Sequence, residues 1–166
     1  VALAAYASRP KLDDIGATQG PEGIIGNPLF TDFKDPLLAK KLEIKQFDEG
    51  TARVSSFEVQ QQPSGIWTIP SHGNYPADAE SQLKALAETF VDLKVIGIDA
   101  KAQDPKKEHE LYGVNDPSTV DVGAKGVGTL IAMQDAKGDE LLRLIVGKEV
   151  AGATNHRFVR KPKEDV

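Results

Sequence analysis

Apolar side chains between residues 78 and 93 recur at the spacing of one helical face. Leu83, Leu86, Ala87, Phe90 and Val91 follow the i, i+3, i+4, i+7, i+8 pattern, and polar side chains occupy most positions between them. This periodicity predicts an amphipathic helix at about residues 78–93, whose apolar side must pack against another element. We expect it to be the principal helix of the fold.

Two acidic residues mark the predicted start of this helix. Asp78 is placed to accept a hydrogen bond from an unpaired backbone N–H of the first turn, and Glu80 adds negative charge where the helix dipole favours it. The sequence therefore predicts that Asp78 is the N-cap.

A short strand is predicted just before the helix. Trp67, the only Trp of the chain, alternates with Ile69, and Pro70 ends the strand. We expect Trp67 to form the core together with Leu83 and Phe90.

The remaining apolar stretches are short and predict a sheet built from hairpins. They lie at residues 42–47, 53–59, 95–98, 127–133, 141–146 and 156–160. Turns that contain Asp and Gly separate the first stretch from the second and the fourth from the fifth. The alternation slips near Ser55 and Ser56, which indicates either a bulge or a misjudged register. The stretch at 141–146 is the most continuously apolar, so we expect it to be the central strand.

Helix signals recur at two other places. Asp104, Pro105 and Gly113 bracket a second, short helix at about residues 105–112, and Asp35 followed by Pro36 predicts one helical turn before the sheet. Successive hairpins with one dominant helix favour an α+β fold with a mostly antiparallel sheet.

Composition narrows the functions that the chain can have. It has 166 residues, a net charge of −5 and no Cys. The length suits one domain with its own core. An acidic chain without clustered Lys and Arg argues against binding to nucleic acid. The lack of Cys excludes disulfides, thiolate metal ligands and a cysteine nucleophile, and it fits either redox compartment.

The N-terminal part has a different composition from the rest. Residues 1–8 hold the apolar run from Val1 to Ala7, which is too short to span a bilayer. This run suits the end of a membrane anchor, the tail of a signal peptide or the first element of a soluble domain, and its abrupt change to a polar linker favours the anchor. Residues 9–35 are rich in Pro and Gly and predict a tether. Residues 36–166 then form a single α+β domain, which would lack a closing strand if one follows Val166.

Motifs for metal binding, phosphate binding or catalysis are not supported. The glycine-rich run at residues 123–128 precedes a predicted strand, whereas a P-loop opens a helix, so we expect a flexible strand-entry loop. The three histidines, His72, His109 and His156, lie in separate predicted elements, so we expect no metal site. No Gly-x-Ser-x-Gly elbow is present. The sequence therefore predicts no catalytic residue and no cofactor.

One loop carries side chains suited to contact a ligand or a partner. His72, Asn74 and Tyr75 are polar or aromatic and precede the principal helix. The structural interpretation, which we prefer, is that Tyr75 and Pro76 form a hydrophobic staple that sets the angle at which the chain enters the helix.

Five short motifs, taken in order, resemble a known family. They are Trp67 in a strand, Tyr75-Pro76-Ala77-Asp78 opening a helix, Leu111-Tyr112-Gly113-Val114 with Asp116-Pro117, Leu144-Ile145-Val146-Gly147-Lys148, and Phe158-Val159-Arg160. Over about residues 29–166 this order resembles the bacterial domain-of-unknown-function family numbered four-three-four-zero. The resemblance implies anchoring by an N-terminal helix and, for some members, genes beside ABC transporters of the gliding-motility type. It implies no reaction and no catalytic residues.

These inferences predict a non-enzymatic domain at the extracytoplasmic face of the cell membrane. It would be a scaffold or accessory component of an envelope complex, for example of an ABC transporter. The alternative is a ligand-binding module for envelope glycans or small molecules that uses His72, Asn74 and Tyr75. An enzyme would instead need converging carboxylates with shifted pKa values in one cleft.

Overall fold

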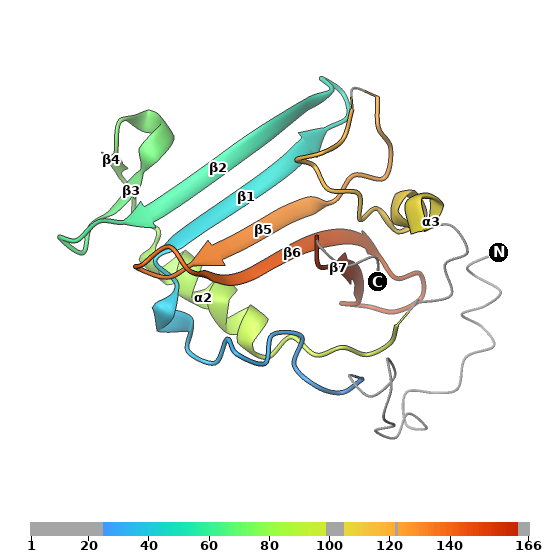
Figure 1. Ribbon diagram of the computed structural model, residues 1–166, viewed down its shortest axis with the longest axis horizontal. Helices are drawn as coiled ribbons and strands as arrows, with labels where there is room; N and C mark the ends of the chain where they lie inside the picture. Colours follow the sequence, from blue (N-terminus) through green and yellow to red (C-terminus); the bar gives the residue numbers. More distant parts are fainter. Residues whose placement is uncertain (1–24, 99–104, 122, 163–166) are drawn as a thin grey trace.

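The computed structural model describes residues 25–98, 105–121 and 123–162. These residues form one seven-stranded sheet in the order β4-β3-β2-β1-β5-β6-β7, together with two α-helices (Figure 1). The strands are β1 (Lys41–Asp48), β2 (Arg53–Gln61), β3 (Trp67–Ile69), β4 (Tyr75–Pro76), β5 (Thr129–Gln134), β6 (Glu140–Glu149) and β7 (Arg157–Arg160). The helices are α2 (Glu80–Val91) and α3 (Pro105–Tyr112), with two short 3₁₀-helices, η3 (Pro36–Leu38) and η4 (Pro70–His72). All strand pairs are antiparallel, so the predicted α+β fold is confirmed.

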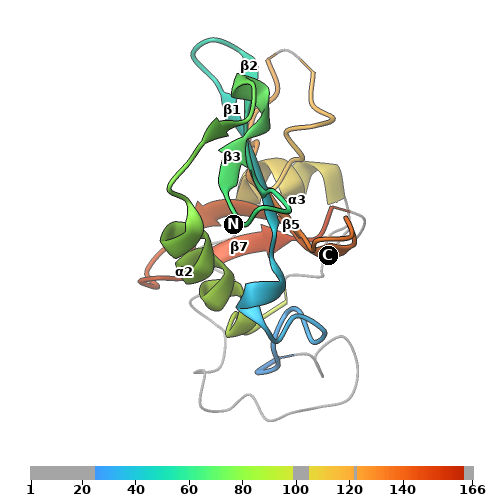
Figure 2. The same ribbon diagram turned by 90° about the vertical axis from the view of Figure 1, so that its left-hand side faces the viewer.

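The register of the strands gives the sheet two apolar faces. Met133 pairs with Leu142 on one face, and Leu130 pairs with Ile145 on the other, since neighbouring side chains of a strand point in opposite directions. α2 lies over the first face and α3 over the second, as the turned view shows (Figure 2).

The larger core lies between α2 and the sheet. α2 contributes Leu83, Ala87 and Phe90, which are all buried. The other buried members of the cluster are Phe33, Ala39, Leu42, Val59, Trp67, Met133, Leu142 and Leu144. The predicted packing of Trp67 with the apolar stripe of the principal helix is therefore confirmed.

The predicted cap of α2 is wrong. Ala79 occupies the N-cap position, and no side chain caps the helix there. The physical reason is β4, whose pairing with β3 keeps the chain extended: the Ala77 N–H donates to the Trp67 carbonyl oxygen at 2.8 Å. Asp78 therefore lies one residue too early to cap a helix that begins at Glu80.

The other helix signals are confirmed where the structure describes them. The Asp35 carboxylate accepts a hydrogen bond from the Leu37 N–H at 2.9 Å at the start of η3. α3 ends before Gly113, which has a left-handed φ of 71°. The predicted cap Asp104 lies outside the described residues.

Residues 95–98 do not form the predicted strand. Residues 93–95 instead pair with the irregular segment at 26–29. The Leu29 N–H donates to the Leu93 carbonyl oxygen at 2.8 Å, and the Val95 N–H donates to the Asn27 carbonyl oxygen at 3.1 Å. Pro28 stands in the middle of this pairing and has no N–H to donate, so the contact stays a single bridge, Pro28 to Lys94.

Of the two interpretations of the irregular alternation near Ser55 and Ser56, the bulge is wrong. β1 and β2 pair without interruption from Lys41 and Gln60 to Asp48 and Arg53. The alternative interpretation, a misjudged register, holds instead: Val54 and Phe57 lie on opposite faces of the sheet, and both are exposed.

The stretch at 141–146 lies in β6, second from one edge of the described sheet, and β1 holds the centre. The prediction that it is central is therefore wrong. β6 is continuously apolar for another reason: Leu142 and Leu144 belong to the core under α2, while Ile145 belongs to the cluster under α3. Both faces of the sheet are covered at this strand.

Part of the predicted tether packs against the domain. Phe33 is only 2% exposed, and Leu29 and Phe30 pack against the same core. Phe30 meets Phe90 edge to face, with ring centroids 6.5 Å apart. The packed domain thus begins before residue 36. The predicted anchor or signal segment at 1–8 lies outside the described residues, within which no helix is long and apolar enough to cross a membrane.

Candidate functional site

The candidate residues His72, Asn74 and Tyr75 lie on the connection between β3 and β4. His72 ends η4, and Gly73 and Asn74 follow with left-handed φ values of 66° and 59°. This backbone reverses the chain, so that Tyr75 pairs with Ile69 of β3. We call residues 65–77, which hold β3, η4 and β4, the β3–β4 lobe; it projects from one end of the sheet (Figure 1).

The three candidate side chains all face solvent. The His72 Nδ1 lies 3.0 Å from the Ser71 hydroxyl, and the Tyr75 side chain is 68% exposed. The predicted staple is therefore wrong for Tyr75, because β4 pairs the residue with β3 and leaves its ring outside the core. The contact of His72, Asn74 and Tyr75 with a ligand or a partner stays a prediction.

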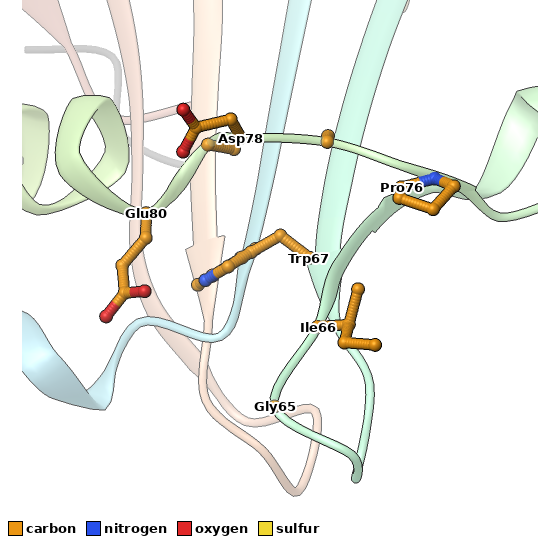
Figure 3. A pocket seen from close by; sticks show the side chains of 8 residues that line it. Gly65, Ile66, Trp67, Pro76, Asp78 and Glu80 are labelled. Atoms are coloured by element: carbon orange, nitrogen blue, oxygen red, sulfur yellow. The ribbon is translucent and has the colours of Figure 1, made fainter.

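A shallow cleft of about 390 Å³ lies between the β3–β4 lobe and the start of α2 (Figure 3). Residues 65–67 border it on one side and residues 76–80 on the other. None of His72, Asn74 and Tyr75 lines it. The sequence pattern missed the cleft, because it is formed by residues that the helix, the strand and the turn each supply for their own local reasons.

Trp67 is the most buried large side chain of the cleft. It is 5% exposed, and its indole nitrogen Nε1 is buried without a hydrogen-bond partner. Leaving such a donor unpaired costs about 1–3 kcal/mol relative to a satisfied one. The nitrogen-bearing edge of the ring points toward Glu80 (Figure 3).

The cleft carries unbalanced negative charge. Asp78 and Glu80 are both exposed, and neither forms a hydrogen bond or an ion pair through its carboxylate within the part of the chain that the structure describes. Elsewhere in the sheet acidic side chains pair with basic ones, as Glu58 does with Lys41 at 3.0 Å. The potential at the cleft therefore favours cations over anions.

A clear pKa shift lies away from this cleft, at Asp48 in the β1–β2 turn. Backbone and side-chain hydrogen bonds from Thr51, and a backbone bond from Gly50, hold the pKa of the Asp48 carboxyl below its usual value. These bonds close the hairpin turn, so Asp48 has a structural role.

The glycine-rich run at 123–128 has a packing role in the structure. A Cβ on Gly126 would collide with the backbone of Glu110, and a Cβ on Gly128 would come within 2.8 Å of the Gly113 carbonyl oxygen. A Cβ on Gly147 of β6 would collide with the Tyr112 carbonyl oxygen. We call Gly126, Gly128 and Gly147 the glycine seat of α3. The prediction of a flexible loop is therefore wrong at Gly126 and Gly128, which pack tightly against the end of α3.

The histidines remain apart, as their sequence positions predicted. His72 lies in the β3–β4 lobe, His109 in α3, and His156 in the turn before β7, where its Nδ1 lies 2.7 Å from the Thr154 carbonyl oxygen. Within the described ranges no three His, Cys, Asp or Glu side chains are grouped so that they could hold a metal ion.

The comparisons with known proteins give one match. A family model described as a domain of unknown function (DUF4340) matches residues 67–166. This range begins at Trp67 and includes β3, β4, both helices and β5 to β7. It leaves out β1, β2 and two residues that line the cleft, Gly65 and Ile66. The curated proteins and the solved structures give no match.

Proposed function

Because the chain belongs to the DUF4340 family, whose function is unknown, we propose its role from the molecule itself. We propose that it is a binding domain without catalytic activity. It serves as a scaffold or accessory component of a membrane complex at the extracytoplasmic face of the cell membrane, for example of an ABC transporter.

Exposed apolar side chains in and beside the β3–β4 lobe carry this proposal. In and beside the β3–β4 lobe, Ile66 is 55% exposed, Tyr75 68% and Phe57 of neighbouring β2 48%. Aromatic side chains of this size contribute most to protein interfaces when a partner buries them. An apolar side chain that makes no core contact in the isolated chain is thus available for a partner.

The composition of the N-terminal part supports the membrane location. The apolar run from Val1 to Ala7 is followed by a linker rich in Pro and Gly. Such a linker holds a domain away from a bilayer while it keeps the domain at high local concentration beside membrane partners.

Site-specific crosslinking in native membranes tests this proposal. The full-length protein carries a photoreactive phenylalanine analogue in place of Tyr75 or Phe57, and in place of Lys137 in the exposed β5–β6 turn as the control. We expect the first two positions to crosslink the same partner and the control position to crosslink none. Recovery of all the protein in the soluble fraction contradicts the membrane location, and equal crosslinking from all three positions contradicts the interface.

The alternative proposal is a ligand-binding module for envelope glycans or small molecules. The exposed loop with His72, Asn74 and Tyr75 favours it, because an exposed aromatic ring beside polar groups suits a sugar face. Retention of the protein on a glycan matrix of cell-wall fragments, lost in Tyr75→Ala but kept in Phe57→Ala, would support this alternative over the first proposal.

A further inference from the structure

We propose that the cleft at the start of α2 binds an extended segment of a partner protein that carries a Lys or Arg side chain. This inference rests on the proposed function and specifies the chemistry of the partner. The cleft is the open hollow of about 390 Å³ between residues 65–67 and 76–80. It lies beside the exposed Tyr75 of the same lobe but is lined by different side chains.

The first argument is the unpaired donor of Trp67. Its side chain is 95% buried, and its Nε1 has no hydrogen-bond partner. Buried polar groups nearly always have a partner, so an orphan donor beside a cleft marks a place where an acceptor binds. The nitrogen-bearing edge of the ring lies on the side of Glu80, an exposed residue that lines the cleft (Figure 3).

The second argument is the uncapped start of α2. Ala79 is the N-cap, and it has no side-chain acceptor for the free N–H groups of the first turn. Ala79 and Glu80 both line the cleft. The uncapped helix start therefore borders the cleft, and an extended peptide presents carbonyl acceptors at regular intervals along its main chain.

The third argument is charge, which decides between a peptide and a free anion. A helix start with unpaired donors ordinarily attracts phosphate or carboxylate groups. Asp78 and Glu80 oppose this, since both residues line the cleft and carry a negative charge (Figure 3). The ligand must then combine uncharged hydrogen-bond acceptors with a positive charge. A peptide does so when its main-chain carbonyl groups accept and a Lys or Arg side chain carries the charge. Ile66 on the rim adds an apolar contact.

Selection from a peptide library tests this site with the full-length protein. The probe is a library of dye-labelled nonapeptides with amidated C-termini, and binding is followed by polarisation of the dye and by the emission of Trp67, which is the only Trp. The cleft variant is Asp78→Asn with Glu80→Gln. The control variant, Glu110→Gln with Asp121→Asn, removes the same charge from exposed positions on and after α3.

We expect the unchanged protein and the control variant to select peptides rich in Lys or Arg and to shift the Trp67 emission on binding. The cleft variant should bind the selected peptides at least about tenfold more weakly, with less dependence on salt. Selection of no peptide, of acidic peptides, or of peptides that the cleft variant binds equally well overturns the inference. The proposed function stands after any of these outcomes if the protein still crosslinks its partner through Tyr75 and Phe57. In that case only the peptide site fails.

Discussion

The two faces of the sheet are covered by helices in different ways. On the α2 face, the side chains of Leu83, Ala87 and Phe90 fill the space between helix and strands. On the α3 face, the buried cluster among the described residues consists of Val114, Leu130 and Ile145. There the end of α3 comes so close to the strands that its backbone touches the glycine seat directly.

Polar contacts complete the closure of the α3 face. Lys148 of β6 donates through Nζ to the Leu111 carbonyl oxygen at 3.0 Å, and the buried Arg160 of β7 donates through Nε to the Val114 carbonyl oxygen at 3.1 Å. Tyr112 and Phe158 stack with centroids 4.3 Å apart. The α2 face thus depends on the volume of apolar side chains, whereas the α3 face depends on the absence of side chains and on hydrogen bonds to a helix end.

The largest expected effect comes from a cavity on the α2 face. Phe90→Ala should lower the free energy of unfolding by about 3–5 kcal/mol, because Phe90 is 5% exposed and its removal leaves a void that the core cannot fill. Leu111→Ala on α3 is the control: this side chain is 52% exposed and should cost less than about 0.5 kcal/mol. Urea denaturation of the full-length protein measures both. Equal losses would show that α2 does not form the main core.

The glycine seat should tolerate no side chain. Gly126→Ala should cost about 1–3 kcal/mol more than Gly73→Ala, because the new Cβ collides with the backbone of Glu110. Gly73 is a matched control, since its φ of 66° is close to the 63° of Gly126 and nothing lies within 4 Å of its Cβ position. The difference between the two therefore isolates the collision from backbone strain. If the two variants unfold at the same urea concentration, α3 does not sit as closely as described.

A smaller effect should follow from removing the contact of Lys148 with the end of α3. Lys148→Met keeps most of the apolar stem of the side chain. It loses the hydrogen bond to Leu111 and the charge that the helix C-terminus favours, at a cost of about 1 kcal/mol. Hydrogen exchange should show faster exchange in α3 and unchanged rates in α2. Lys137→Met, in the exposed β5–β6 turn, should change neither helix.

The smallest expected effect is on the pH dependence of stability. It comes from Asp48 in the β1–β2 turn, away from both helix-covered faces. Because the pKa of Asp48 is lowered in the folded chain, its contribution to stability is present above the unfolded value of about 3.9 and is lost as the pH falls through the lower folded value. Asp48→Asn should therefore flatten the pH dependence of unfolding only in this acidic range. A carboxyl titration by NMR with a midpoint at or above about 3.9 would contradict the hydrogen-bonded turn.

The sequence alone determined the local elements. The helical period at Leu83 to Val91, the alternation in β1 and β5, and the Asp and Gly turns predicted most helices and strands, because each signal acts between near neighbours along the chain. Local signals also misled. Asp78 has the chemistry of a cap, and residues 95–98 have the composition of a strand, but their partners across the fold decided otherwise.

Tertiary structure alone decided what lies beside what. It placed β1 at the centre, covered both faces of β6, and turned a glycine-rich run into the seat of α3. It also brought the orphan nitrogen of Trp67 next to the uncapped start of α2, which no pattern along the chain could show. The physical reason is the distance along the chain over which each signal acts. Periodicity shows which side of one helix or strand is apolar. A cleft or a backbone contact depends on segments that are distant in sequence and meet only when the chain folds.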